Sequence, residues 1–146
     1  MNLKILIIDK DINIPIPVYS TEHSSGLDIS SASLQPIILQ SMETVLIPTN
    51  IKLEIPVGYE GQIRPRSGLA IKHNIGIINS PGTIDADYRG ELKILLTNFV
   101  KNDFTVNFGD RIAQLVICKV ERAEIIIEES LTETKRNEGG FGHTGV

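Results

Sequence analysis

The chain has little that would cross-link it or carry it into a membrane. Its 146 residues contain one cysteine, no tryptophan and only 5% aromatic residues. The single cysteine, Cys118, excludes an internal disulfide, and its apolar neighbours predict a buried small side chain rather than a nucleophile. No stretch approaches the ~18 apolar residues of a membrane span. The N-terminal apolar run ends at Asp9, too early for a signal peptide, so we expect a cytoplasmic protein without membrane contacts.

A strong positive charge is also missing. The net charge is -4, so the chain lacks the basic surface that sequence-independent binding to nucleic acid requires. Any anionic ligand must therefore be held by a few local cations. The histidines, His23, His73 and His143, show no metal-ligand spacing, and we expect them at the surface. Because aromatic residues are few, the core must be aliphatic and chiefly isoleucine.

What the sequence does contain is a series of short, β-branched runs separated by Gly, Pro, Asn and Asp. This pattern is typical of an all-β sandwich, jelly roll or small barrel in one domain. Only Ser67–His73 reads as a helix, of barely two turns, with Ser67 as its cap. The predicted strands are Lys4–Ile8, Ile37–Leu39, Thr44–Pro48, Ile51–Glu54, Tyr59–Arg64, Ile75–Ile78, Leu92–Asn98, Thr105–Val106, Arg111–Cys118 and Glu124–Glu128.

The C-terminal end is rich in glycine, and its composition changes near Thr132. We therefore divide the chain into a β domain, residues 1–131, and an arm, residues 132–146. Such an arm has little to bury and is expected to be mobile on its own. It carries an aromatic ring, Phe141, and a permanent cation, Arg136, which suit an arm that closes over a flat, negatively charged ligand. The alternative is a terminus without a role.

A pair of carboxylates follows a turn signal in the segment Asn79–Gly90. Pro81-Gly82 predicts a turn, and Thr83-Ile84 predicts the start of a strand. If the chain stays extended, Asp85 and Asp87 share one face of it, whereas a turn would break this alternation. A carboxylate at this place could act as a general base on water or bind a cation. Otherwise the segment is a polar hairpin with solvated acids.

Three further segments could contact an anion. In Arg64–Ala70, two arginines and a serine meet the start of the short helix, where free N–H groups and the helix dipole favour phosphate. In Gly109–Leu115, Arg111 and Gln114 could both donate to phosphate, although strict strand alternation places them on opposite faces. Asp28 could stand at the start of a strand. Each segment is also compatible with ordinary surface residues or, for Asp28, a turn.

Five motifs occur here in one order: SSGLD, RPRSGLA, NSPGTIDADYRGE, GDRIAQL and RNEGGFGHTG. This ordered set resembles the five motifs of the trimeric dUTP pyrophosphatases (dUTPases), over most of the chain. The departures are small: Ser25 stands where the family usually has Ala, Asn137 where it often has Gly, and His143 replaces a common Ser. None removes a catalytic side chain, although Asn137 would stiffen the arm slightly.

The resemblance implies a jelly-roll-like β-clip subunit with one short helix and a flexible, glycine-rich C-terminal arm. It also implies a homotrimer with shared active sites. The implied reaction is Mg²⁺-dependent hydrolysis of dUTP to dUMP and diphosphate, which supplies dUMP for thymidylate synthesis and keeps uracil out of DNA. In that reaction Asp85 would activate the water that attacks the α-phosphorus in line. Asp28 would hold the water shell of Mg²⁺, which the substrate phosphates bind directly.

The other motif residues are expected to bind substrate by the same resemblance. Asn79 would read uracil, and Tyr88 would pack under the deoxyribose and exclude a 2′-hydroxyl. From the arm of another subunit, Phe141 would stack on uracil and Arg136 would reach the γ-phosphate. The full set is Arg66, Ser67, Gly68, Asn79, Gly82, Thr83, Ile84, Tyr88, Arg111, Gln114, Arg136, Phe141 and Gly142.

Two other functions compete with this one. The dCTP deaminases have the same fold and a similar third motif, but they carry a catalytic Glu three residues before the terminal Asn of a strand. Here Leu95 stands at that distance from Asn98, so the deaminating base is absent. The second rival is a non-catalytic β-sandwich that binds proteins or signals with bound nucleotide. Such a module would not need Asp85.

Overall fold

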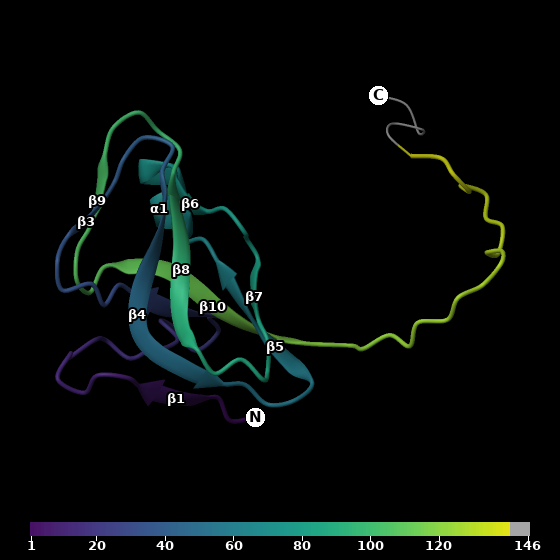
Figure 1. The fold of residues 1–146 in the computed structure, drawn as a ribbon, viewed down its shortest axis with the longest axis horizontal. Coiled ribbons are helices and arrows are strands. Elements are labelled where there is room, and N and C mark those ends of the chain that lie inside the picture. Colours follow the sequence, from purple (N-terminus) through teal and green to yellow (C-terminus); the bar gives the residue numbers. More distant parts are fainter. Residues whose placement is uncertain (141–146) are drawn as a thin grey trace.

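The computed structural model describes residues 1–140, which form short antiparallel strands and one helix (Figure 1). This arrangement confirms the predicted all-β fold. The elements are β1 (Lys4–Ile7), β2 (Gly26–Ser30), β3 (Ile37–Leu39), β4 (Thr44–Glu54), β5 (Tyr59–Arg64), α1 (Ser67–His73), β6 (Ile75–Ile77), β7 (Gly82–Ile84), β8 (Glu91–Asn98), β9 (Phe104–Val106) and β10 (Arg111–Lys119). No helix of the described part is long and apolar enough to cross a membrane.

Two four-stranded sheets enclose the core. One has the order β1-β4-β8-β6 and the other β2-β10-β5-β7, while β3 and β9 pair as a separate ribbon. Inward side chains alternate with outward ones along the strands, as in β8, where Leu92, Ile94 and Leu96 are buried. Within residues 1–140 the buried hydrophobic side chains are all aliphatic and mostly isoleucine, which confirms the prediction for the core.

Strand β4 is one long strand where the sequence predicts two, divided at Pro48. Its pairing with β8 shifts register between Pro48 and Lys52, and Asn50 there has a positive φ of 60°. The Glu91 carboxylate accepts the Thr49 and Asn50 N–H groups, at 3.2 and 3.0 Å. At this irregularity the Glu91 side chain thus replaces the backbone acceptors of β8, and β4 continues past Pro48.

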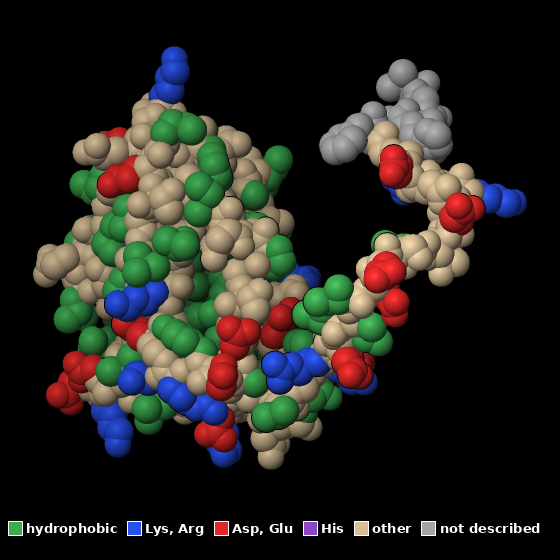
Figure 2. Space-filling model, turned by 45° about the vertical axis from the view of Figure 1, so that its right-hand side comes forward, with side chains coloured by type: hydrophobic (Ala, Val, Ile, Leu, Met, Phe, Trp, Pro, Cys, Tyr) green, Lys and Arg blue, Asp and Glu red, His purple; other side chains and the backbone are tan. Residues whose placement is uncertain are grey.

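Two strand predictions were wrong in opposite ways. Strand β2 was missed, and Asp28 lies in its middle rather than at its start. The predicted strand Glu124–Glu128 does not form, because nothing in the described chain pairs with it. Residues 120–140 contain no helix or strand and lead away from the body in both views (Figures 1 and 2). Ile125 and Ile127 are 89% and 95% exposed.

Candidate active site

Asp28 joins two arginines that lie far from it in the sequence. It projects from the outward face of β2, between the buried Leu27 and Ile29. Its Oδ1 accepts a hydrogen bond from Nε of Arg66 at 2.9 Å, and its Oδ2 accepts one from a terminal guanidinium nitrogen of Arg111 at 3.0 Å. The Asp28 carboxylate is only 19% exposed, whereas the Arg111 side chain is 57% exposed. One carboxylate therefore holds two guanidinium groups at the surface, where they can meet an anion.

A β-bulge brings Arg111 and Gln114 to the same side of β10. The register shifts between Arg111 and Ala113, and the two residues Ile112 and Ala113 are both buried. The outward side chains are therefore separated by two inward ones, which strict alternation does not allow. Gln114 pairs with Asp28 across the strands and donates to the Pro65 carbonyl at 2.9 Å. The predicted placement on opposite faces was wrong.

The helix start lies beside this cluster, but Ser67 does not cap it. The cap position is Arg66, in an extended conformation and without a side-chain cap bond. Ser67 is the first helical residue, and its exposed side chain lines a hollow of about 310 Å³ together with Asp28, Arg66 and Gln114. A Cβ added to Gly68 would meet no atom within 4 Å, so packing within the chain does not require this glycine.

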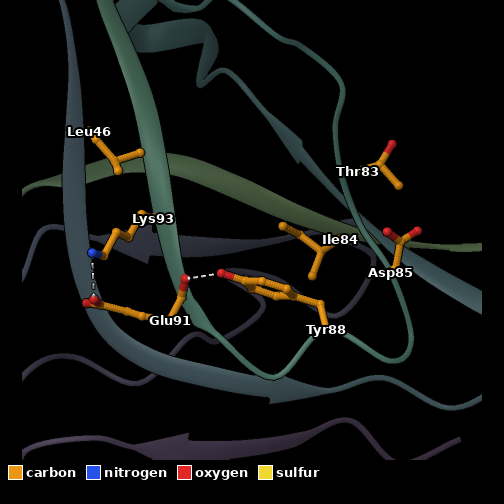
Figure 3. Close-up of a pocket in the computed structure, with 7 residues that line it drawn as sticks. All are labelled: Leu46, Thr83, Ile84, Asp85, Tyr88, Glu91 and Lys93. Atoms are coloured by element: carbon orange, nitrogen blue, oxygen red, sulfur yellow. Dashed lines mark hydrogen bonds and ion pairs between the residues drawn. The ribbon is translucent and has the colours of Figure 1, made fainter.

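The segment after β7 turns sharply, so Asp85 and Asp87 do not share an extended face. The Tyr88 N–H donates to the Asp85 carbonyl at 3.1 Å, which closes the turn. Asp85 lines a hollow of about 360 Å³ with Thr83, Ile84 and Tyr88, and Asp87 does not (Figure 3). Both carboxylates line a neighbouring hollow of about 620 Å³, so it is the hollow with Tyr88 that distinguishes Asp85 as the candidate base.

The entrance to this segment brings Asn79 against Gly82. Ser80 and Pro81 between them are joined by a cis peptide bond. Gly82 is buried and pairs with Ile63 of β5, and a Cβ there would lie 3.0 Å from the Asn79 amide nitrogen. Asn79 is exposed at the surface, so its amide and the nearby backbone are accessible to a ligand.

Three residues of the Asp85 hollow were not predicted as site residues: Leu46, Glu91 and Lys93. Lys93 lies 3.5 Å from the Glu91 carboxylate and faces away from Asp85 (Figure 3). All three come from β4 and β8, in the sheet opposite β7. Glu91 ends the third motif but was given no role there, and no motif contains Leu46 or Lys93. Only the closure of the two sheets brings these residues to Asp85.

The two hollows share no lining residue, and Asp28 and Asp85 lie apart along the sheet β2-β10-β5-β7. Asp28 and Gln114 are level with Arg64 of β5, whereas Asp85 follows Ile84, which is level with Gly61. The offset is about 13 Å along the strands and about 14 Å across three strand spacings, or roughly 20 Å in all. Within one chain, the arginine cluster and the candidate base cannot both reach one phosphate group.

The arm is described only in part. Thr134 and Asn137 exchange hydrogen bonds of 2.6 and 3.0 Å, and Asn137 has a positive φ of 40°. The Arg136 side chain is exposed and donates to the Gly139 carbonyl at 2.7 Å. Phe141 and Gly142, two predicted substrate-binding residues, lie outside the described residues, as does His143.

Other residues noted in the sequence take no part in either hollow. His23 and His73 are exposed, as predicted. Cys118 is half-buried rather than buried, and its sulfur lies 3.8 Å from the Arg64 guanidinium. Among residues 1–140 there is no group of three or more His, Cys, Asp or Glu side chains that could hold a metal ion.

Comparison with known proteins identifies one family. A family model described as dUTPase matches residues 12–145. A deoxyuridine 5'-triphosphate nucleotidohydrolase of Rickettsia felis is 57% identical over 133 residues, which cover 90% of this chain and 88% of that protein. The protein of the same name from Finegoldia magna is 52% identical over 143 residues, covering 98% and 99%.

Solved structures agree with these relatives. The dUTPase of Staphylococcus bacteriophage 80alpha with dUpNHpp superposes with a TM-score of 0.87 at 29% identity, and each chain is covered to 99%. A dUTPase mutant from the S. aureus phage phi11, described with a structural Mg(II) ion, gives a TM-score of 0.81 at 26% identity, with 91% of this chain and all of that one covered. On the match of nearly its whole length, this chain belongs to the dUTPase family.

Proposed function

We propose that this chain hydrolyses dUTP to dUMP and diphosphate, with a water activated by Asp85 attacking the α-phosphorus in line. The observation that carries the proposal is the state of the Asp85 carboxylate. It is exposed in a hollow beside Tyr88, and it has no hydrogen-bond or ion-pair partner among residues 1–140. A carboxylate with free lone pairs can accept a proton from water.

The arginine cluster supplies the charge that a triphosphate needs. Arg66 and Arg111 already point outward on Asp28, and Gln114 lies beside them with one amide hydrogen directed to Pro65. Gly68 leaves room for a phosphate to approach the backbone. Phosphoryl transfer depends chiefly on positioning and charge neutralisation, which these groups provide without changing shape.

The donor set fits a magnesium ion bound mainly through substrate. Mg²⁺ keeps several waters and takes few protein ligands, in accord with the absence of a metal-binding cluster in the described chain. A carboxylate offers about four acceptor sites, and Arg66, Arg111 and Ser20 occupy three of those on Asp28. Asp28 can thus accept one metal-bound water. The ion would neutralise phosphate charge, while Asp28 orients the arginines.

The base and the sugar would be read by the segment between β6 and β8. The backbone around Gly82 is fixed by pairing with β5, and Asn79 lies against it. Fixed donors and acceptors reject cytosine because its position 4 has the opposite hydrogen-bond polarity to that of uracil. Further along the segment, Tyr88 lines the Asp85 hollow with Thr83 and Ile84 and would contact the deoxyribose.

We propose that the active site is completed between subunits of a homotrimer. The separation of roughly 20 Å between Asp85 and Asp28, estimated from the strand spacings, is too large for one chain to hold the α-phosphate at both. A neighbouring chain can place its arginine cluster opposite Asp85. The isoleucines of residues 125–127 are exposed in the single chain, and contact with a neighbouring subunit would bury their apolar surface. The arm, residues 132–146, would then close over a site on another subunit and exclude water.

The test is a pair of asparagine variants on the two sides of the turn. Asp85→Asn should bind dUTP and release no diphosphate, because the amide cannot accept the water proton. Asp87→Asn, the matched control outside the hollow, should keep near-wild-type turnover. Full activity of Asp85→Asn would contradict the mechanism.

The two rival functions give different readouts in the same assay. Diphosphate and ammonia are measured with Mg²⁺ and dUTP, dCTP, dTTP and UTP. Ammonia from dCTP would indicate a deaminase, although Leu95, opposite Leu46 in the sheet, offers no carboxylate for that reaction. Binding of dUTP without turnover by the wild-type protein would indicate a binding module.

A further inference from the structure

Tyr88 is exposed to solvent but held at both ends. Its side chain is 45% exposed. Its N–H donates to the Asp85 carbonyl at 3.1 Å, and its hydroxyl donates to the Glu91 carbonyl at 3.0 Å (Figure 3). The ring therefore spans from the turn after β7 to the first residue of β8. An exposed ring fixed in this way has lost its rotamer freedom before any ligand arrives.

The acceptor of the hydroxyl is itself immobile. Glu91 pairs with Lys52 of β4, and its carboxylate accepts the Thr49 and Asn50 N–H groups at 3.2 and 3.0 Å. On the other side, the Arg89 guanidinium donates to the Ala86 and Tyr88 carbonyls, at 2.7 and 2.9 Å. The turn and the strand that carry Tyr88 are thus tied to each other and to β4.

Gly90 provides the space in which the ring lies. A Cβ at this position would overlap the Tyr88 hydroxyl and lie 2.5 Å from Cζ and 2.9 Å from Cε2. Gly90 does not have a positive φ, unlike Gly58 and Gly109, so its backbone conformation is open to other residues. The requirement for glycine here comes from the ring and not from the turn.

We propose that Gly90 is a specificity-determining positioning residue, which fixes the Tyr88 ring through the space it leaves and through the Glu91 carbonyl. The inference rests on the proposed function, in which Tyr88 faces the sugar. Steric rejection of a 2′-hydroxyl works only if the Tyr88 ring cannot move aside, because a ring that moves would make room for ribose. Gly90 would thereby set the preference for dUTP over UTP without touching either nucleotide.

The experiment measures kcat/KM for dUTP and UTP in wild type, Gly90→Ala, Tyr88→Phe and Tyr88→Ala. Gly90→Ala should reduce the dUTP-to-UTP ratio by about tenfold or more, since a misplaced positioning group costs up to about a hundredfold. Tyr88→Phe, which loses only the bond to Glu91, should reduce the ratio less. A general structural defect would lower both substrates alike and leave the ratio unchanged.

Two controls isolate the contact. Gly76→Ala places a Cβ 2.9 Å from the Phe99 ring, away from both hollows, and should leave the ratio at the wild-type value. In a Tyr88→Ala background, Gly90→Ala should have no further effect on the ratio, because the ring it displaces is gone. If the ratio of Gly90→Ala equals that of wild type, or if the effect persists without the ring, the proposal is wrong. If Gly90→Ala does not fold, an unchanged ratio in Tyr88→Phe overturns it.

These outcomes are separate from a failure of the proposed function. Loss of the mechanism would appear as full turnover in Asp85→Asn or as no turnover of dUTP by wild type. Failure of the inference alone would appear as normal dUTP turnover with an unmoved sugar preference.

Discussion

Replacing Gly26 by alanine should impair turnover and leave folding almost unchanged. Gly26 lies in β2 directly beside Gln114, and a Cβ there would overlap Oε1 of Gln114 and lie 3.2 Å from both its Cβ and its Cδ. The Gln114 amide cannot stay where it is, since the Gln114 side chain lies over Gly26. It must rotate away from the Pro65 carbonyl, to which it donates at 2.9 Å.

The magnitudes differ between stability and activity. Losing the bond to Pro65 costs about 1 kcal/mol, and replacing a strand glycine with alanine returns about 0.5 to 1 kcal/mol. The melting temperature should therefore move by less than about 3 °C. A hydrogen bond from Gln114 to a charged phosphate is worth about 1.5 to 3 kcal/mol, which corresponds to a fall of about 10- to 100-fold in kcat/KM.

The assay compares diphosphate release and thermal unfolding for Gly26→Ala, Gln114→Ala and the double variant. The two single variants should lose similar activity, and the double variant should lose no more than either, because both remove the same contact. Additive losses, or a Gly26→Ala variant with normal kcat/KM, would show that the position of the Gln114 amide does not matter. The reasoning from the steric contact would then be refuted.

Other predictions concern stability and assembly. Asn98→Ala should cost about 3 to 5 kcal/mol of unfolding free energy. The buried Asn98 amide donates to the Leu39 and Asn102 carbonyls at 3.0 and 2.8 Å and accepts the Val100 N–H at 3.1 Å. A loss below about 1 kcal/mol in urea unfolding would contradict this prediction. The hydrogen bond from Lys4, and then its charge, lower the pKa of Glu54 below its ordinary 4.5. The pair's contribution is present above that pH and is lost as pH falls through the folded-state pKa, and Lys4→Met should raise the pKa in a carboxyl NMR titration. Ile125→Ser with Ile127→Ser should shift the sedimentation of the proposed trimer toward monomer, and a trimer that sediments as in wild type would exclude this segment from the subunit contact.

Much of the fold could be predicted because its strands carry β-branched runs between clear breakers. The runs that became β5, β8 and β10 pair within the chain and were located to within a residue or two. Glu124–Glu128 is a similar aliphatic run but has no strand partner among residues 1–140, and the sequence pattern does not distinguish the two cases. β2 was missed because its apolar residues, Leu27 and Ile29, are only two.

The motifs predicted which residues lie in the candidate site. They did not predict the arrangements that depend on strand pairing and turn geometry. Asp28, Arg66, Ser67, Gly68 and Gln114, which come from three separate motifs, lie around one hollow, and their binding of phosphate stays a prediction. The bulge that turns Arg111 and Gln114 to one side depends on pairing with β2, which no local pattern reveals. The turn after Asp85 is closed by the bond from the Tyr88 N–H to the Asp85 carbonyl and by the Arg89 side chain, which donates to two carbonyls of the turn; the sequence pattern shows neither. Gly26 and Gly90 belong to the first and third motifs, but only the side chains packed over them show why glycine stands at these positions.

The wide spacing of the two hollows has a genetic consequence. If each site takes its base from one subunit and its arginine cluster from another, defects in the two halves complement each other. Mixing an inactive Asp85 variant with an inactive Arg66 variant in equal amounts would leave about a quarter of the sites intact in randomly assembled closed oligomers. Two inactive alleles of this one gene could then restore activity together in the same cell, as if they were mutations in different genes.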